Sequence, residues 1–253
     1  ESLMENNVYT SLCTDEEFIP GLIGLYLSLK KTKSIYPFEP IITSNVKKEK
    51  LKILDELNIV YHIFPIKFFN NWSYHSCTIN KFYAYELYQY DKVCFLDADI
   101  ILLKNIDNYF DILNDDKDFA ITHYDIVDLD NDDNNRFLGA WFILKPKKDY
   151  CYEILSKFKT YNNDEEVLEL LYKNSKKFVY LPHVKKVMIH WWAQPKYWIF
   201  YKLKNLKDYI SFINNPNLTL SEELEDFDFD SIVKRELSEY HTVGVYFDEA
   251  EKS

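Results

Sequence analysis

The sequence predicts an α/β protein in which helices flank a mostly parallel β-sheet on both faces. The order of the predicted elements favours this class, and the composition allows a core of the size that it needs. Stretches of strand length, rich in β-branched and aromatic residues, alternate with amphipathic stretches of helix length through the first half of the chain. The chain has 253 residues, of which 47% are hydrophobic and 17% aromatic, so it can bury a large core.

The first half of the chain predicts strict alternation of strands and helices. Residues 7–13 have strand composition, and Thr14-Asp-Glu-Glu17 after them is a capping pattern. Pro20 suits the first turn of a helix that ends near Lys33. The next elements are expected as strands at 41–43, 59–66 and from 93 onward, and as helices at 46–57 and 78–90.

The second half of the chain is less regular. We expect strands at 118–124, 137–145, 178–181 and 187–190, and helices at 149–158, 165–172 and 203–213. Residues 131–135 form a polar loop, and the chain is acidic from 214 onward. The predicted organisation is therefore a single domain over residues 1–213, followed by an acidic C-terminal extension over residues 214–253.

Charge and composition exclude several classes of partner. A formal net charge of -11 argues against binding to nucleic acid or to an anionic membrane. No apolar run reaches the ~18 residues that a membrane span needs, and no N-terminal targeting signal is apparent. The four cysteines have no CxxC spacing, so we expect reduced thiols in a cytoplasmic protein.

Two carboxylates, Asp97 and Asp99, follow the apolar stretch Val93-Cys-Phe-Leu96 directly. Ligands of parallel α/β sheets bind beyond the carboxyl ends of the strands, so this pair is expected at the site. Two acids at a buried edge would repel each other, and a divalent cation would relieve that repulsion and could neutralise a diphosphate. The alternative is an ordinary solvated acidic turn.

Only four glycines are present, Gly21, Gly24, Gly139 and Gly244, so neither a Walker A loop nor a GxGxxG turn can form. A phosphate group would need a metal or a lysine instead.

A family resemblance rests on several separated stretches. The segment Thr78-Ile-Asn-Lys81 begins a helix that leads into "FLDADI", and His190 to Trp198 has the spacing HxxxxxKxW. Together with Leu12-Cys-Thr-Asp-Glu-Glu-Phe18, these stretches resemble glycosyltransferase family 8, most closely its glycogenin-like branch. The resemblance covers roughly residues 8 to 200 and implies a GT-A type, Rossmann-like fold.

The resemblance also implies roles for individual residues. His190 becomes a third metal ligand beside Asp97 and Asp99, with Ala98 between the two acids, and the metal is Mn²⁺, with Mg²⁺ as the other candidate. Lys196 contacts the diphosphate and Lys81 lies near the sugar. The uridine of the donor is expected to lie against Leu12, Thr14, Asp15 and Phe18.

Each of these roles has a structural alternative. His190 could be a buried strand-end histidine, Lys196 a solvated lysine and Lys81 a charge on a helix surface. For Phe18 we favour packing in the core over stacking on the base.

The chain departs from the glycogenin-like pattern at four places. Leu138-Gly139-Ala140 replaces an Asn-Ser-Gly stretch, and Asp164-Glu165 replaces an Asp-Gln pair near the sugar. Trp72 stands where the branch has an arginine. Few residues separate Pro182 from His190, so the loop that carries the usual acceptor tyrosine is missing.

The resemblance implies a retaining, Mn²⁺-dependent transfer of a hexose from a UDP-sugar, with UDP-glucose the expected donor, to a hydroxyl of a glycan or protein. Self-glucosylation and a homodimer stay open. Asp164 or Glu165 would lie near the sugar. Two other classes are a metal-dependent nucleotide-sugar hydrolase and a non-catalytic carbohydrate-binding protein that uses Trp191, Trp192 and Trp198.

Overall fold

A five-stranded mixed sheet forms the centre of the fold. We describe it from a computed structural model in which residues 5–70, 74–123, 136–158, 160–182, 187–191, 196–197 and 203–214 are placed. The strand order is β1-β5-β8-β7-β9. The strands are β1 (Asn7–Thr10), β5 (Lys92–Leu96), β7 (Phe119–His123), β8 (Phe137–Leu144) and β9 (Phe178–Tyr180).

Parallel pairing dominates the flanks of this sheet, and β8 is the exception. β1 pairs with β5 and β7 with β9 in parallel, whereas β8 runs antiparallel to both of its neighbours. The expected α/β fold of GT-A type is confirmed, with a sheet that is mixed because of β8. Every residue of β5 and β8 is buried, as expected for central strands that are covered on both faces.

Two smaller sheets extend the fold. A parallel sheet joins β2 (Leu12–Cys13), β3 (Ile41–Thr43) and β4 (His62–Phe64). An antiparallel pair joins β6 (Ile100–Leu102) to β10 (Met188–His190).

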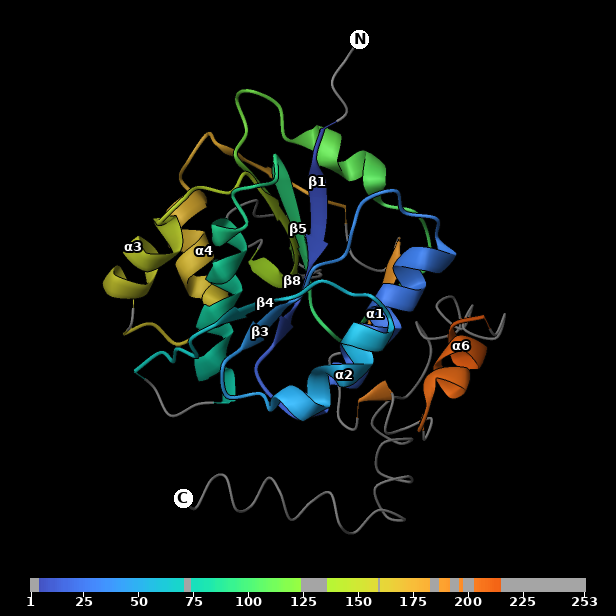
Figure 1. Cartoon of the computed structure of the whole chain (residues 1–253). Coiled ribbons are helices and arrows are strands. Elements are labelled where there is room, and N and C mark those ends of the chain that lie inside the picture. Colours follow the sequence, from blue (N-terminus) through green and yellow to red (C-terminus); the bar gives the residue numbers. More distant parts are fainter. Residues whose placement is uncertain are drawn as a thin grey trace, which may run out of the picture. The chain divides into compact units, whose positions relative to one another are not determined.

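Helices cover the sheets on two sides (Figure 1). One side carries α3 (Tyr150–Lys157), α4 (Asp164–Tyr172) and a long 3₁₀ helix, η2 (Tyr74–Glu86). The other side carries α1 (Ile19–Lys31) and α2 (Lys48–Glu56). Within the described residues, no helix is long and apolar enough to cross a bilayer.

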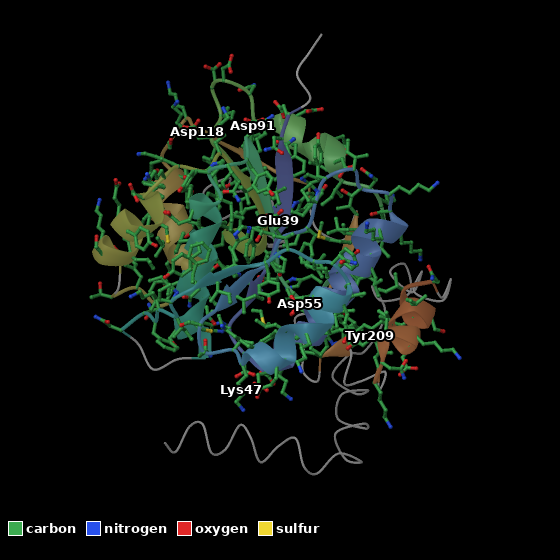
Figure 2. The ribbon with its side chains drawn as sticks, viewed as in Figure 1. Glu39, Lys47, Asp55, Asp91, Asp118 and Tyr209 are labelled. Atoms are coloured by element: carbon green, nitrogen blue, oxygen red, sulfur yellow. The ribbon has the colours of Figure 1, made fainter. Side chains whose placement is uncertain are left out.

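The strand directions place the candidate acids at the carboxyl ends of the central strands. Asp91 and Asp118 immediately precede β5 and β7, and both lie at the upper end of the view in Figure 2. The carboxyl ends of these strands therefore lie at the opposite end of the sheet, and Asp97 follows β5 there.

Several sequence predictions need correction. The expected strand at 59–66 is only β4, which ends at Phe64 because Pro65 has no N–H to extend the ladder. The helix expected at 78–90 is the 3₁₀ helix η2, which begins and ends four residues earlier. Asp15, not Thr14, caps the turn η1 (Glu16–Phe18), since its side chain accepts from the Glu17 N–H. Strand β6 and the 3₁₀ helix η3 (Asp107–Ile112) were not predicted from the sequence.

The chain divides into two compact units, Glu1–His190 and Trp191–Ser253. The described part of the second unit contains α6 (Leu206–Asn214), close to the helix expected at 203–213. The polar loop at 131–135, Trp72 and the acidic residues from 215 onward lie outside the described residues, so the domain limits 1–213 and 214–253 stay predictions. The four cysteines are free thiols, three of them buried, and their reduced state in the cell stays a prediction.

Candidate functional site

Asp97 and Asp99 lie in the tight turn between β5 and β6. The Asp97 N–H donates to the Ala140 carbonyl at 2.9 Å, and the Ile100 N–H donates back to the Asp97 carbonyl at 3.1 Å. The turn is therefore fixed to β8 on one side and leads directly into β6 on the other.

The register of β6 and β10 brings His190 to the same turn. His190 is the partner of Ile100 in this antiparallel pair, so its side chain lies next to the residue that follows Asp99. The His190 Nε2 atom is 3.4 Å from Asp99 Oδ1 and 3.8 Å from Asp97 Oδ2. His190 is a largely buried residue at the end of β10 that lies beside both acids, and its role as a metal ligand stays a prediction.

These three side chains, which we call the acidic trio, have the geometry of a metal site. One ligand atom from each of Asp97, Asp99 and His190 lies within 4.8 Å of the others. Carboxylate oxygens suit Mg²⁺ and Mn²⁺, while an imidazole nitrogen favours a transition ion such as Mn²⁺ over Mg²⁺. The residues present therefore fit the expected ion.

Burial and mutual charge perturb the acidic trio. Burial raises the pKa of the Asp97 carboxyl, against the opposing effect of the Lys81 ammonium. Burial alone would lower the pKa of His190, but its hydrogen bond to Asp99 and the charges of Asp99 and Asp97 outweigh this and raise the pKa. The trio therefore stabilises positive charge, which a divalent cation would supply.

Lys81 forms a second cluster beside the acidic trio. Its Nζ atom is 2.9 Å from Asp97 Oδ1 and 3.2 Å from Asp164 Oδ2, and it donates to the Gly139 carbonyl at 3.0 Å. Lys81 is only 8% exposed, so the reading as a surface charge is wrong. Although burial alone would lower its pKa, the charges of Asp164 and Asp97 raise it, and the lysine stays protonated.

The first turn of α4 supplies the acids expected near the sugar. Asn163 caps the helix by accepting from the Glu166 N–H, and Asp164 and Glu165 follow it at the N-terminus. Glu165 Oε1 accepts from the Gly139 N–H at 2.9 Å, and the Asp164 N–H donates to Thr78 Oγ1 at 3.3 Å. We call Lys81, Gly139, Asp164 and Glu165 the lysine cluster.

The segment expected to hold the uridine follows β2. Leu12, Thr14 and Phe18 are half-buried, whereas Asp15 is exposed. The Thr14 hydroxyl lies 3.6 Å from the Cys77 thiol, one helical turn before Lys81. This contact places the segment beside the start of η2, but its role toward a uridine stays a prediction.

Lys196 belongs to the second unit. It is 8% exposed, and its Nζ atom donates to the Trp191 carbonyl at 3.3 Å. The reading as a solvated lysine is therefore wrong, while its contact with a diphosphate stays a prediction. Trp192 and Trp198, which the carbohydrate-binding alternative requires, lie outside the described residues.

Solved structures with a similar fold are GT-A glycosyltransferases. The glycosyltransferase GlyE of Streptococcus pneumoniae TIGR4 matches with a TM-score of 0.58 and 13% identity, over 82% of this chain and 63% of that chain. The galactosyltransferase LgtC, solved in complex with donor and acceptor sugar analogues, matches with a TM-score of 0.53 and 13% identity, over 71% and 74% of the two chains. The fold is thus that of the GT-A class.

Sequence similarity identifies the family. The family model described as glycosyl transferase family 8 matches residues 9–166, well over half of the chain, and the chain belongs to this family. Galactinol synthase 1 of Arabidopsis thaliana is 31% identical over 109 residues, 41% of this chain and 32% of the relative. Galactinol synthase 2 of Solanum lycopersicum is 30% identical over 118 residues, 44% and 35% of the two chains. The match therefore spans about a third of these curated relatives.

Proposed function

We propose that this protein transfers a hexose from a UDP-sugar to a hydroxyl acceptor, with retention of configuration and with Mn²⁺ as cofactor. The observation that carries the proposal is the acidic trio, in which ligand atoms of Asp97, Asp99 and His190 lie within 4.8 Å at the carboxyl edge of the sheet. Membership of glycosyltransferase family 8 supports the same reading.

The trio would hold the cation against the diphosphate of the donor. The bound cation would supply charge stabilisation to the departing UDP. Lys196 would add a compact positive charge to the same phosphates. Asp164 would present its carboxylate near the sugar, held there by the Lys81 ammonium at 3.2 Å.

A product analysis tests this function. The protein is incubated with Mn²⁺ and a panel of UDP-sugars, with UDP-glucose and UDP-galactose first, in the presence and absence of maltose and other hydroxyl acceptors. We expect UDP release that rises with acceptor and a new glycoside of unchanged anomeric configuration. Full turnover to free sugar regardless of acceptor would instead identify a nucleotide-sugar hydrolase. Sugar binding with no Mn²⁺ dependence and no turnover would identify a carbohydrate-binding protein.

The finer assignments are part of the same proposal. UDP-glucose is our first donor because of the glycogenin-like stretches, although the curated relatives reported above are galactinol synthases. Transfer to the protein itself is tested by intact mass and peptide mapping after incubation. Because the stretch before His190 is short, any added hexose is expected outside residues 180–190. A cytoplasmic location and a homodimer also stay predictions.

A further inference from the structure

Gly139 lies at a discontinuity in the central sheet. The pairing of β7 with β8 passes from Ile121–Phe142 directly to Thr122–Leu138, so residues 139–141 of β8 form a bulge. Bulges of this kind redirect the chain and are frequent beside active sites. The bulge here removes the Gly139 N–H and carbonyl from the ladder with β7.

Both freed backbone groups of Gly139 bind the lysine cluster. The N–H donates to Glu165 Oε1 at 2.9 Å, and the carbonyl accepts from Lys81 Nζ at 3.0 Å. The ammonium also forms ion pairs with Asp97 at 2.9 Å and with Asp164 at 3.2 Å, so one carbonyl and two carboxylates surround it. One residue thus anchors both α4 and Lys81.

The missing side chain of Gly139 leaves the space that Asp164 fills. A Cβ atom at position 139 would lie 2.3 Å from Asp164 Oδ2, and 3.2 Å from Glu165 Cγ. The first distance is far inside van der Waals contact, so the Asp164 carboxylate would have to move by roughly 1 Å. That movement would disturb the ion pair with Lys81, which lies at 3.2 Å.

We infer that Gly139 is a positioning residue for the transfer reaction, which sets the place of the Asp164 carboxylate in the site by having no side chain. This inference rests on the proposed function. Gly139 contacts no substrate, and the absence of its side chain acts on the reaction through the position of Asp164. Gly139→Ala should therefore reduce kcat by about 100-fold, the order expected for a reacting group misplaced by about 1 Å. The KM for the UDP-sugar and the affinity for Mn²⁺ should stay within about 3-fold, since the acidic trio is unchanged.

A double-mutant cycle separates this role from general damage to the sheet. Gly139→Ala is made in the wild-type chain and in an Asp164→Ala chain, and kcat is measured for all four proteins. If Gly139 acts through Asp164, its substitution has no further effect in the Asp164→Ala background. The matched control is Ile143→Val, a loss of one methyl group in the same buried strand, which should leave kcat within about 2-fold. Equal falls in both backgrounds, or a Gly139→Ala enzyme of normal kcat, would overturn the inference.

Thermal unfolding of the same four proteins gives a readout that needs no activity. Gly139→Ala should lower Tm in the wild-type chain by at least about 2 °C more than in the Asp164→Ala chain, where the clash with Asp164 is absent and only the 3.2 Å approach to Glu165 Cγ remains. Additive Tm changes would show that the alanine does not meet Asp164. If the wild-type protein turns over no donor, the proposed function fails. The Tm cycle still tests whether a side chain at position 139 contacts Asp164.

Discussion

The acidic trio and the lysine cluster are adjacent, yet they balance charge in different ways. The lysine cluster contains its own cation, because the Lys81 ammonium contacts Asp164, the Gly139 carbonyl and also Asp97 of the trio at 2.9 to 3.2 Å. The acidic trio sets two carboxylates against one histidine, whose nearest approach is 3.4 Å. The lysine cluster should therefore contribute mainly to stability, whereas the acidic trio is suited to binding an added metal ion. Substitutions should therefore separate loss of stability from loss of activity.

The largest effect is expected from Asp99→Asn. This change removes a ligand charge without altering shape, so transfer should fall by about 10³-fold or more, because a catalytic metal supplies several kcal/mol of stabilisation. Metal-free stability should be unchanged or higher, since one of two repelling carboxylates is removed. Steady-state kinetics and urea unfolding in EDTA measure the two quantities. Normal activity in a folded Asp99→Asn protein would disprove the metal assignment.

Lys81→Met should mainly lower the stability of the protein, in contrast to Asp99→Asn, which should mainly lower its activity. Removing the ammonium leaves the buried Asp164 carboxylate and the partly buried Asp97 carboxylate without this partner, a loss of about 3–5 kcal/mol in the free energy of unfolding. Lys92→Met is the matched control, because Lys92 is also buried but pairs with Glu5, whose side chain is 44% exposed. The control should cost no more than about 1 kcal/mol. Similar losses of stability in the two variants would show that the lysine cluster contributes no more to stability than the pair of Lys92 with Glu5.

Addition of Mn²⁺ should stabilise the protein through the acidic trio alone. At a concentration of about 100 times Kd, a ligand that binds only the folded state adds about 2.7 kcal/mol, or about 5–10 °C in Tm for a chain of this size. EDTA should reverse the shift and Asp99→Asn should remove it, whereas Gly139→Ala should retain it. An equal shift in Asp99→Asn would place the ion elsewhere.

The smallest effect is expected from Lys196→Ala. Its charge matters most as the diphosphate departs, so kcat should fall by about 10- to 100-fold with little change in the affinity for UDP-sugar. Lys196→Arg should restore only part of kcat, since a planar guanidinium does not replace a compact ammonium. A loss confined to KM would make the lysine a docking contact.

Sequence alone predicted the trio better than the lysine cluster. Asp97 and Asp99 follow a strongly apolar strand, and strand ends collect ligands in this fold class, so their place could be derived. The contacts of Gly139 could not, because a β-bulge depends on the register of two strands far apart in the chain. The one available signal was a glycine inside an otherwise apolar strand, which often marks a bulge or a close approach.

The same limit explains the missed strand β6. Its three residues follow the acidic turn directly, and they form a strand only because β10 arrives from nearly ninety residues later to pair with them. Strand β3 was predicted well because it is a short β-branched run of its own. The single strand expected at 7–13 is instead divided into β1 and β2, which belong to different sheets.

The binding of UDP by titration calorimetry, with Mn²⁺ and with EDTA, tests the central claim most directly. In the proposed function, the acidic trio binds a divalent cation that holds the donor diphosphate. We therefore expect UDP to bind the wild-type protein at least about 10-fold more tightly with Mn²⁺, and Asp99→Asn to bind UDP with the same low affinity in both conditions. Equal affinity of the wild-type protein with Mn²⁺ and with EDTA would contradict the account.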